Sequence, residues 1–196
     1  YVVELARHLA AREEIRKVDL FTRLIDDDRV SDDYANPIET HNDKCRIVRV
    51  RCGGRKYIRK ELLWTSLDEY VDKAIKFFKK EGDNPDLFHG HYADAGYVAM
   101  SLSDIYGIPF ICTGHSLGIP KKEKLLYDGM KEAEIFRKYK INTRIDVEER
   151  VMKTAELIIT STNQEIDNQY GLYDNSEFPE YKVIPPGIDV EKFHPY

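Results

Sequence analysis

The sequence predicts an α/β protein built on a doubly wound parallel β-sheet with helices on both faces. Strand-like and helix-like segments alternate along the whole chain, which is typical of parallel sheets connected by helices. The apolar runs PFICT (109–113) and ELIIT (156–160) are short, as expected for central strands buried on both sides. The 196 residues contain no internal repeat, no low-complexity segment and no interior linker, so we expect one domain over residues 1–196.

The first half of the chain contains two expected strands and two expected helices. Apolar residues at helical spacing predict a helix from the first residue, YVVELARHLAAR. A chain that begins inside a helix and without Met is expected to be a fragment of a longer protein. A strand is expected over 17–23, an exposed acidic excursion over 24–44, a strand over 45–51 and a helix over about 61–80.

The second half continues the alternation. Its expected elements are a strand over 86–91, a helix over 96–106, a strand over 109–113, a loop over 113–124, a charged helix or helix pair over about 131–154, and a strand over 156–161. Ser161 or Thr162 could cap the next helix, with Glu165 near the capping-box position. The chain ends on a strand that leads into a Pro-Pro-Gly turn within residues 181–196.

Composition excludes several classes of protein. With 42% hydrophobic residues the chain can bury a core, so a wholly disordered protein is excluded. The formal net charge of −5 argues against a nucleic-acid partner, and no apolar stretch is long enough for a membrane span. Cys45, Cys52 and Cys112 form no CxxC pair, which favours a reduced chain in the cytoplasm.

Polar and glycine-bearing residues gather where the expected strands end. In open α/β sheets, ligands bind at the carboxyl ends of the strands, near a topological switch point. The residues concerned here are His89, His91, Tyr92 and Asp94, then Gly114, His115, Ser116 and Gly118, and finally Pro185, Pro186 and Gly187. This clustering predicts a site at one edge of the sheet without defining a reaction.

The segment TGHSLG (113–118) and the lysines after it are compatible with a phosphate. Backbone N–H groups in a glycine-bearing loop, followed by Lys121, Lys122 and Lys124, offer the donors that a phosphate needs. The alternative is a solvated, lysine-rich helix start. The basic segment 51–60, which includes Lys60, is either a second anion contact or an exposed loop.

A metal site is an alternative interpretation of the histidines. His89, His91, Asp94 and His115 are of ligand type, and His89 and His91 are expected on one strand. We expect His89 and His91 to converge only if the strand has ended, so a hydrogen-bonded structural or substrate-contacting pair is preferred and we expect no metal. A Ser-His hydrolase is weaker still, because no GxSxG surrounds Ser116.

Arg144 and Arg150 have two interpretations. Arginine suits bidentate phosphate contacts. Both residues also have acidic neighbours, so a surface ion pair with Asp146, Glu148 or Glu149 is equally compatible with the spacing.

Six segments together resemble the sucrose-phosphate synthase family. They are RKYIRKELLW (55–64), HGHYADAG (89–96), TGHSLG (113–118), TRIDVEE (143–149), ITSTNQEID (159–167) and VIPPGID (183–189). The resemblance implies a retaining glycosyltransferase of the GT-B arrangement, with two Rossmann-like domains facing each other, of which this chain would be the N-terminal half. It also leaves a close relative, mannosylfructose-phosphate synthase, open.

By this resemblance, glucose passes from the co-substrate UDP-glucose to fructose 6-phosphate with retention, and no further cofactor is required. His115 would lie at the reacting centre, and the residues that contact the acceptor would be Lys60, Tyr92, Ser116, Lys121 and Arg144. The family's glycine-rich loop would precede Tyr1, and its donor-binding C-terminal domain would follow this chain. Some relatives carry two arginines where this chain has Thr143 and Arg144, so Lys140 could take over part of the phosphate contact. A non-catalytic sugar-phosphate-binding module is the alternative from another class.

Overall fold

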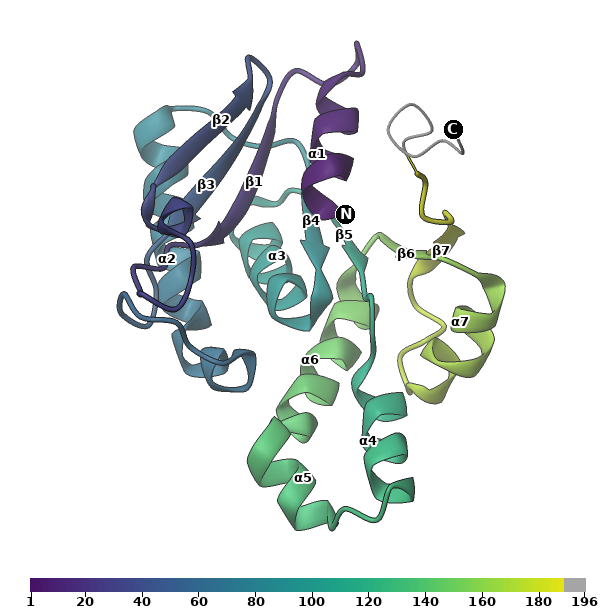
Figure 1. Ribbon diagram of the computed structural model, residues 1–196. Helices are drawn as coiled ribbons and strands as arrows, with labels where there is room; N and C mark the ends of the chain where they lie inside the picture. Colours follow the sequence, from purple (N-terminus) through teal and green to yellow (C-terminus); the bar gives the residue numbers. More distant parts are fainter. Residues whose placement is uncertain (189–196) are drawn as a thin grey trace, which may run out of the picture. The chain divides into compact units, whose positions relative to one another are not determined.

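The computed structural model describes residues 1–188 as an α/β protein (Figure 1). Contacts divide the chain into two compact units, one over Tyr1–Asp83 and one that begins at Asn84, and each is described by itself below. The expectation of one domain over residues 1–196 stays a prediction. None of the helices within residues 1–188 is both long and apolar enough to cross a membrane.

The first unit holds a three-stranded sheet between helices. Its elements are α1 (Val2–Ala10), β1 (Val18–Arg23), the 3-10 turn η1 (Asp32–Ala35), β2 (Ile38–Asn42), β3 (Cys45–Val50), the 3-10 helix η2 (Lys60–Ser66) and α2 (Leu67–Glu81). The strand order is β1-β3-β2, in which β1 and β3 are parallel and β2 is antiparallel. The strands expected over 17–23 and 45–51 are confirmed.

Two expectations for the first unit are corrected. The segment 24–44 is not only an excursion, because Ile38–Asn42 forms β2 at the edge of the sheet. Its residues alternate between exposed and half-buried, so it carries no apolar run that marks a strand. The helix expected over 61–80 divides into η2 and α2, and Gly82 ends α2 in the left-handed conformation.

Successive residues of β1 pack against different helices. Val18 and Leu20 pack against the buried Ala6 and Ala10 of α1, whereas the ring of Phe21 lies 5.2 Å from that of Phe78 in α2. Because successive strand residues point to opposite faces, α1 and α2 cover opposite faces of this sheet. The expected arrangement, with helices on both faces, is therefore present in the first unit.

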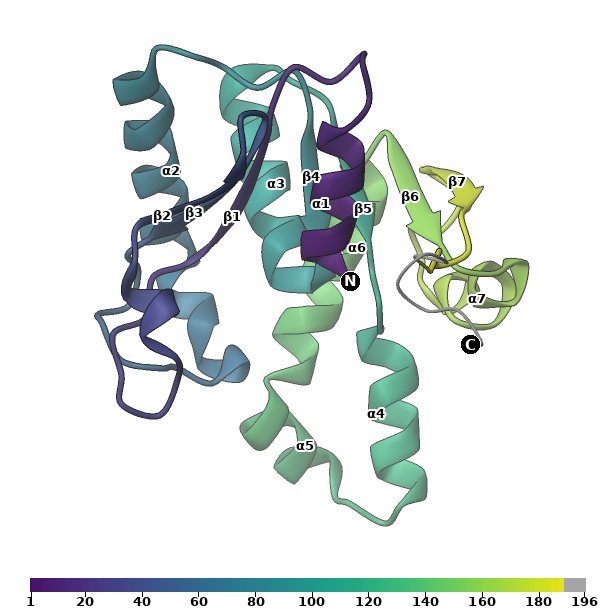
Figure 2. The same cartoon turned by 45° about the horizontal axis from the view of Figure 1, so that its top comes forward.

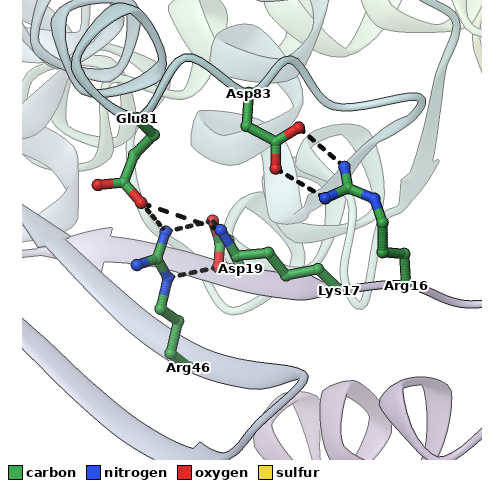
Figure 3. A network of polar contacts seen from close by, with 6 residues as sticks. All are labelled: Arg16, Lys17, Asp19, Arg46, Glu81 and Asp83. Carbon is green, nitrogen blue, oxygen red and sulfur yellow. Dashed lines mark hydrogen bonds and ion pairs between the residues drawn. The ribbon is translucent and has the colours of Figure 1, made fainter.

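An ion-pair network joins the end of α2 to the start of β1 and to β3 (Figure 3). Arg46 donates to Asp19 at 2.8 Å and to Glu81 at 2.7 Å, and Lys17 approaches both carboxylates. Arg16 and Asp83 form a separate, more exposed pair with two hydrogen bonds. The charged side chains of this network come from separate segments of the chain, so sequence spacing alone does not predict their pairing.

The second unit is built on a fully parallel sheet of four strands in the order β4-β5-β6-β7. Its elements are β4 (Phe88–His91), α3 (Tyr92–Tyr106), β5 (Phe110–Thr113), α4 (Gly118–Tyr127), α5 (Glu132–Tyr139), α6 (Ile141–Thr154), β6 (Leu157–Thr160), α7 (Asn163–Asn168), the 3-10 turn η3 (Tyr170–Leu172) and β7 (Glu180–Val183). The helices α4, α5 and α6 pack against one another (Figure 2). The expected central strands and the helix pair are confirmed.

Two boundaries of the second unit differ from the expectation. The helix expected from Gly96 begins at Tyr92, directly after β4, and the loop expected over 113–124 ends where α4 begins at Gly118. The capping expectation is confirmed, because the Thr162 hydroxyl accepts a hydrogen bond from the Glu165 N–H. The final strand is β7, and residues 189–196 of the expected closing segment lie outside the described residues.

A close backbone approach joins β4 to α3. A Cβ atom on Gly90 would lie 2.8 Å from the Cα of Gly96 and 2.9 Å from the carbonyl oxygen of Ala95. Only glycine fits between strand and helix at this distance. The absence of a side chain at residue 90 therefore lets α3 begin at the end of β4, which positions Tyr92.

Candidate functional site

The candidate site lies at the carboxyl ends of β4 and β5 in the second unit. Two non-glycine residues there have left-handed backbone conformations, Tyr92 with φ of 77° and His115 with φ of 59°. Such conformations cost on the order of 1–3 kcal/mol and cluster at functional sites, where surrounding structure holds them. Each follows its strand closely, as expected for residues that form a site at the sheet edge.

Three histidines form a stack across this edge. The ring centroids of His89 and His91 lie 4.1 Å apart, and those of His91 and His115 lie 5.2 Å apart. His91 Nδ1 and His115 Nε2 are 2.9 Å apart, and His89 Nε2 lies 2.9 Å from the Thr113 hydroxyl. His89 and His91 are two residues apart in β4, so both rings point to the same face of the strand. The expectation that they converge only where the strand has ended is therefore wrong. His89 and His91 are therefore each hydrogen-bonded, to Thr113 and to His115, and they stack on each other without a hydrogen bond between them.

Burial keeps these rings uncharged. It lowers the pKa of His89 to about 3 and, together with the charge of neighbouring His115, the pKa of His91 to about 4. Burial also lowers the pKa of His115. Neutral imidazoles can each donate one hydrogen bond and accept another. Within residues 1–188, no group of three or more His, Cys, Asp or Glu side chains is arranged to hold a metal ion.

Arg144 connects three of the predicted acceptor contacts. It lies on α6, is only 4% exposed, and donates from Nη2 to the backbone carbonyl and the hydroxyl of Ser116. Its guanidinium lies over the ring of Tyr92, 4.3 Å from the centroid. Arg144, Ser116 and Tyr92 therefore lie together, although 52 residues separate Tyr92 from Arg144 in the sequence.

Glu148 is the ion-pair partner of Arg144. From the sequence, it is expected only as one of several residues that could form a surface ion pair. It accepts a hydrogen bond from Arg144 Nε at 2.8 Å, one turn along α6, and it is 5% exposed. The pair is therefore buried, unlike the surface pair that spacing suggested. An i,i+4 spacing beside apolar Val147 and Val151 is the one sequence signal that could have indicated this.

The same carboxylate caps α4. Glu148 Oε2 accepts hydrogen bonds from the Gly118 N–H at 2.8 Å and from the Tyr173 hydroxyl, which in turn accepts from the Ile119 N–H. A Cβ atom on Gly118 would lie 2.7 Å from Glu148 Oε2, so a larger residue would displace the carboxylate. Burial raises the pKa of Tyr173, which keeps this hydroxyl protonated. Glu148 thus fixes the start of the helix that carries Lys121, and no local signal points to Tyr173.

The lysines of α4 differ in their surroundings. Lys121 is half-buried, with Nζ 4.4 Å from the centre of the Tyr139 ring. Lys122 pairs with Glu132 at 2.6 Å, and exposed Lys124 pairs with Asp128 at 3.4 Å. Lys124 therefore matches the solvated helix start, and the phosphate interpretation of Lys121 stays a prediction.

Three further predicted residues are Lys140 and Arg150 of the second unit and Lys60 of the first unit. Lys60 is exposed at the start of η2 in the first unit, where Arg55 forms an exposed ion pair with Asp26 and Arg59 pairs with the largely buried Glu61. Lys140 joins α5 to α6 in a left-handed conformation, with Nζ 5.9 Å from the Phe136 ring centre. Arg150 is exposed beside Tyr97. The second unit therefore gathers Tyr92, His115, Ser116 and Arg144, and Lys60 is described only with its own unit.

Comparison with known proteins supplies the family. The profile of Glycosyltransferase Family 4 matches residues 1–192, which is nearly the whole chain. The chain belongs to Glycosyltransferase Family 4. Sucrose-phosphate synthase 4 of Arabidopsis thaliana is 40% identical over 232 aligned residues, and sucrose-phosphate synthase of Zea mays is 40% identical over 236.

Both relatives are much longer than this family 4 chain. The alignments include 96% of the chain but only 22% of each relative. The solved structure of a sucrose-phosphate synthase from Thermosynechococcus elongatus superposes on the whole chain with a TM-score of 0.79 and 28% identity, and the match covers 44% of that structure. The fold is therefore that of the first half of a sucrose-phosphate synthase, and the GT-B expectation is confirmed.

Proposed function

We propose that this chain is the acceptor-binding part of a sucrose-phosphate-synthase-like enzyme. The enzyme would transfer glucose from UDP-glucose to fructose 6-phosphate with retention at the anomeric carbon, giving sucrose 6-phosphate and UDP. The observation that carries the proposal is the cluster of Tyr92, His115, Ser116 and Arg144 at the ends of β4 and β5. It occurs in a chain that is 40% identical to enzymes named sucrose-phosphate synthase.

The proposed roles follow from the chemistry of each side chain. Lys121, Arg144 and, from the first unit, Lys60 supply positive charge to the acceptor phosphate, which is a dianion. The hydroxyls of Tyr92 and Ser116 bond sugar hydroxyls. Arg144 also keeps these two groups in place, because its guanidinium contacts both.

His115 acts at the reacting centre as a neutral hydrogen-bonding group between the two sugars. Its lowered pKa supports this role, because a neutral ring can stabilise developing charge without titrating. The left-handed backbone at His115 also supports this role, because strained conformations of this kind cluster at functional sites.

The donor belongs to the part of the enzyme beyond this chain. We propose that a second, C-terminal domain binds UDP-glucose and that no metal or organic cofactor is needed. We place the enzyme in the cytoplasm, where the three buried free cysteines would stay reduced.

Lys121→Ala in the full-length enzyme tests the acceptor site. The KM for fructose 6-phosphate should rise roughly 10- to 100-fold, because a charge-assisted hydrogen bond contributes about 1.5–3 kcal/mol. Lys124→Ala is the matched control, since Lys124 lies on the same helix but pairs with Asp128 at an exposed position. An unchanged acceptor KM in Lys121→Ala would remove this residue from the site. A protein that binds the acceptor but transfers no glucose would favour a non-catalytic sugar-phosphate-binding module.

A further inference from the structure

The histidine stack contains a residue to which the proposed function gives no role. His91 touches His115 directly, through the 2.9 Å contact between Nδ1 and Nε2. It lies on β4, whereas His115 lies on the loop after β5. The two strands are paired so that His91 is opposite Thr113, which brings residue 91 next to the start of that loop.

His115 needs support from a neighbouring element. The residue is exposed, and it lies in a loop with a left-handed backbone. The ring is only partly buried, so contacts with neighbouring side chains help to determine its direction. His91 is half-buried and stacks on His89, whose own Nε2 lies 2.9 Å from the Thr113 hydroxyl. The contacts form a chain from β5 through two rings of β4 to His115.

The contact also couples the protonation of two rings. A single hydrogen lies between His91 Nδ1 and His115 Nε2, so one ring donates and the other accepts. The nitrogen that carries the hydrogen in one neutral ring therefore constrains the tautomer of the other. Burial favours the neutral form of both rings, so this constraint applies at neutral pH.

We propose that His91 is a positioning residue that fixes the ring orientation and the tautomer of His115 for glucosyl transfer. The proposal rests on the proposed function, because it assigns His115 to the reacting centre. His91 itself acts through His115 and contacts neither sugar. The requirement is specific: a nitrogen or oxygen able to hydrogen-bond must lie where His91 Nδ1 lies.

Three substitutions in the full-length enzyme separate this requirement from simple packing. His91→Phe keeps a flat ring but removes both nitrogens. His91→Asn places a polar atom close to the Nδ1 position, and His91→Gln places one close to the Nε2 position instead. The kcat of His91→Phe and His91→Gln should fall about 10-fold, the equivalent of one hydrogen bond, while the KM for fructose 6-phosphate stays unchanged. His91→Asn should recover most of the lost kcat.

The outcomes that overturn the proposal are distinct. Equal kcat in all three variants and wild type would show that His91 positions nothing. An equal loss in all three, with His91→Asn included, would show that a hydrogen-bonding atom at the Nδ1 position is not sufficient. Wild-type kcat in His91→Phe alone would show that ring packing and not the hydrogen bond matters. A rise in acceptor KM without a fall in kcat would place His91 in substrate binding.

A crystal structure of the full-length His91→Phe variant gives a readout that does not need activity. The His115 ring should leave its wild-type orientation or occupy more than one, and an unmoved ring would overturn the proposal. If the wild-type enzyme transferred no glucose, the proposed function would fail, and the crystal structure would still decide whether His91 positions His115. The failure of one proposal is therefore distinguishable from the failure of the other.

Discussion

Glu148→Gln is the most informative single perturbation of the site, because one buried carboxylate holds three elements. Oε1 of Glu148 accepts from Arg144, and Oε2 accepts from Gly118 and Tyr173. Glutamine has the same shape but replaces one of these oxygens with an NH2 group, which must face at least one donor. It also removes the negative charge beside Arg144, which is 4% exposed.

The expected cost follows from these contacts. Removing one partner of a buried ion pair costs about 3–5 kcal/mol, since the remaining charge stays buried without compensation. We therefore expect Glu148→Gln to lower the free energy of unfolding by about 3–5 kcal/mol, measured by urea denaturation with an unchanged m-value. Removing both charges with Arg144→Met and Glu148→Leu together should cost less than the sum of the single changes.

A matched control exists on a neighbouring helix. Lys124 and Asp128 form an i,i+4 pair as Arg144 and Glu148 do, but their side chains are 76% and 49% exposed. Asp128→Asn should therefore change the free energy of unfolding by less than about 0.5 kcal/mol. A loss below about 1 kcal/mol for Glu148→Gln would refute the reasoning that this carboxylate holds the site together.

Three further predictions concern stability. Burial lowers the pKa of His89 to about 3 in the folded chain, against an ordinary value of 6.5. The unfolded state therefore binds more protons below about pH 6.5, and the free energy of unfolding should fall by about 2 kcal/mol between about pH 7 and pH 5. Denaturation curves of His89→Gln should lack this part of the pH dependence, and an identical dependence would contradict the neutral, buried ring. Gly90→Ala should lower the free energy of unfolding by about 1–3 kcal/mol, because the added Cβ meets backbone atoms. Gly187→Ala, with open space around the added Cβ, should lower it by less than about 0.5 kcal/mol. Equal losses in denaturation experiments would disprove the close approach of β4 and α3. Arg46→Met should lower the free energy of unfolding by about 1.5–3 kcal/mol, and Arg16→Met by less than about 1 kcal/mol. The reverse order in thermal or urea unfolding would mean that the network of Figure 3 is not centred on Arg46.

The central strands of the second unit could be predicted because short apolar runs identify them. FICT (Phe110–Thr113) and LIIT (Leu157–Thr160) form strands in which buried residues alternate with half-buried ones. β2 could not be predicted because its residues alternate between exposed and half-buried, so this edge strand contains no apolar run. The start of α4 could not be predicted either, because Gly118 and Pro120 look like loop residues. Proline is tolerated in a first helical turn, and the capping groups, Glu148 and Tyr173, come from distant segments.

In the candidate site, too, local sequence patterns could be predicted, whereas contacts between distant segments could not. Clustering at strand ends correctly brought Tyr92, His115 and Ser116 to one edge, because parallel strands end together. The spacing of Arg144 could not show whether its carboxylate partner is exposed or buried, since burial depends on α3 and α4. The contact between His91 and His115 depends on strand register, which the sequence alone does not determine.

Acceptor competition in the full-length enzyme tests the central claim most directly. With UDP-glucose as donor, wild-type enzyme should convert fructose 6-phosphate to sucrose 6-phosphate, and a large excess of free fructose should compete poorly, because the phosphate contacts would be lost. Lys121→Ala should narrow the preference between the two acceptors. Equal use of fructose and fructose 6-phosphate by the wild-type enzyme, or no glucosyl transfer to either, would contradict the account.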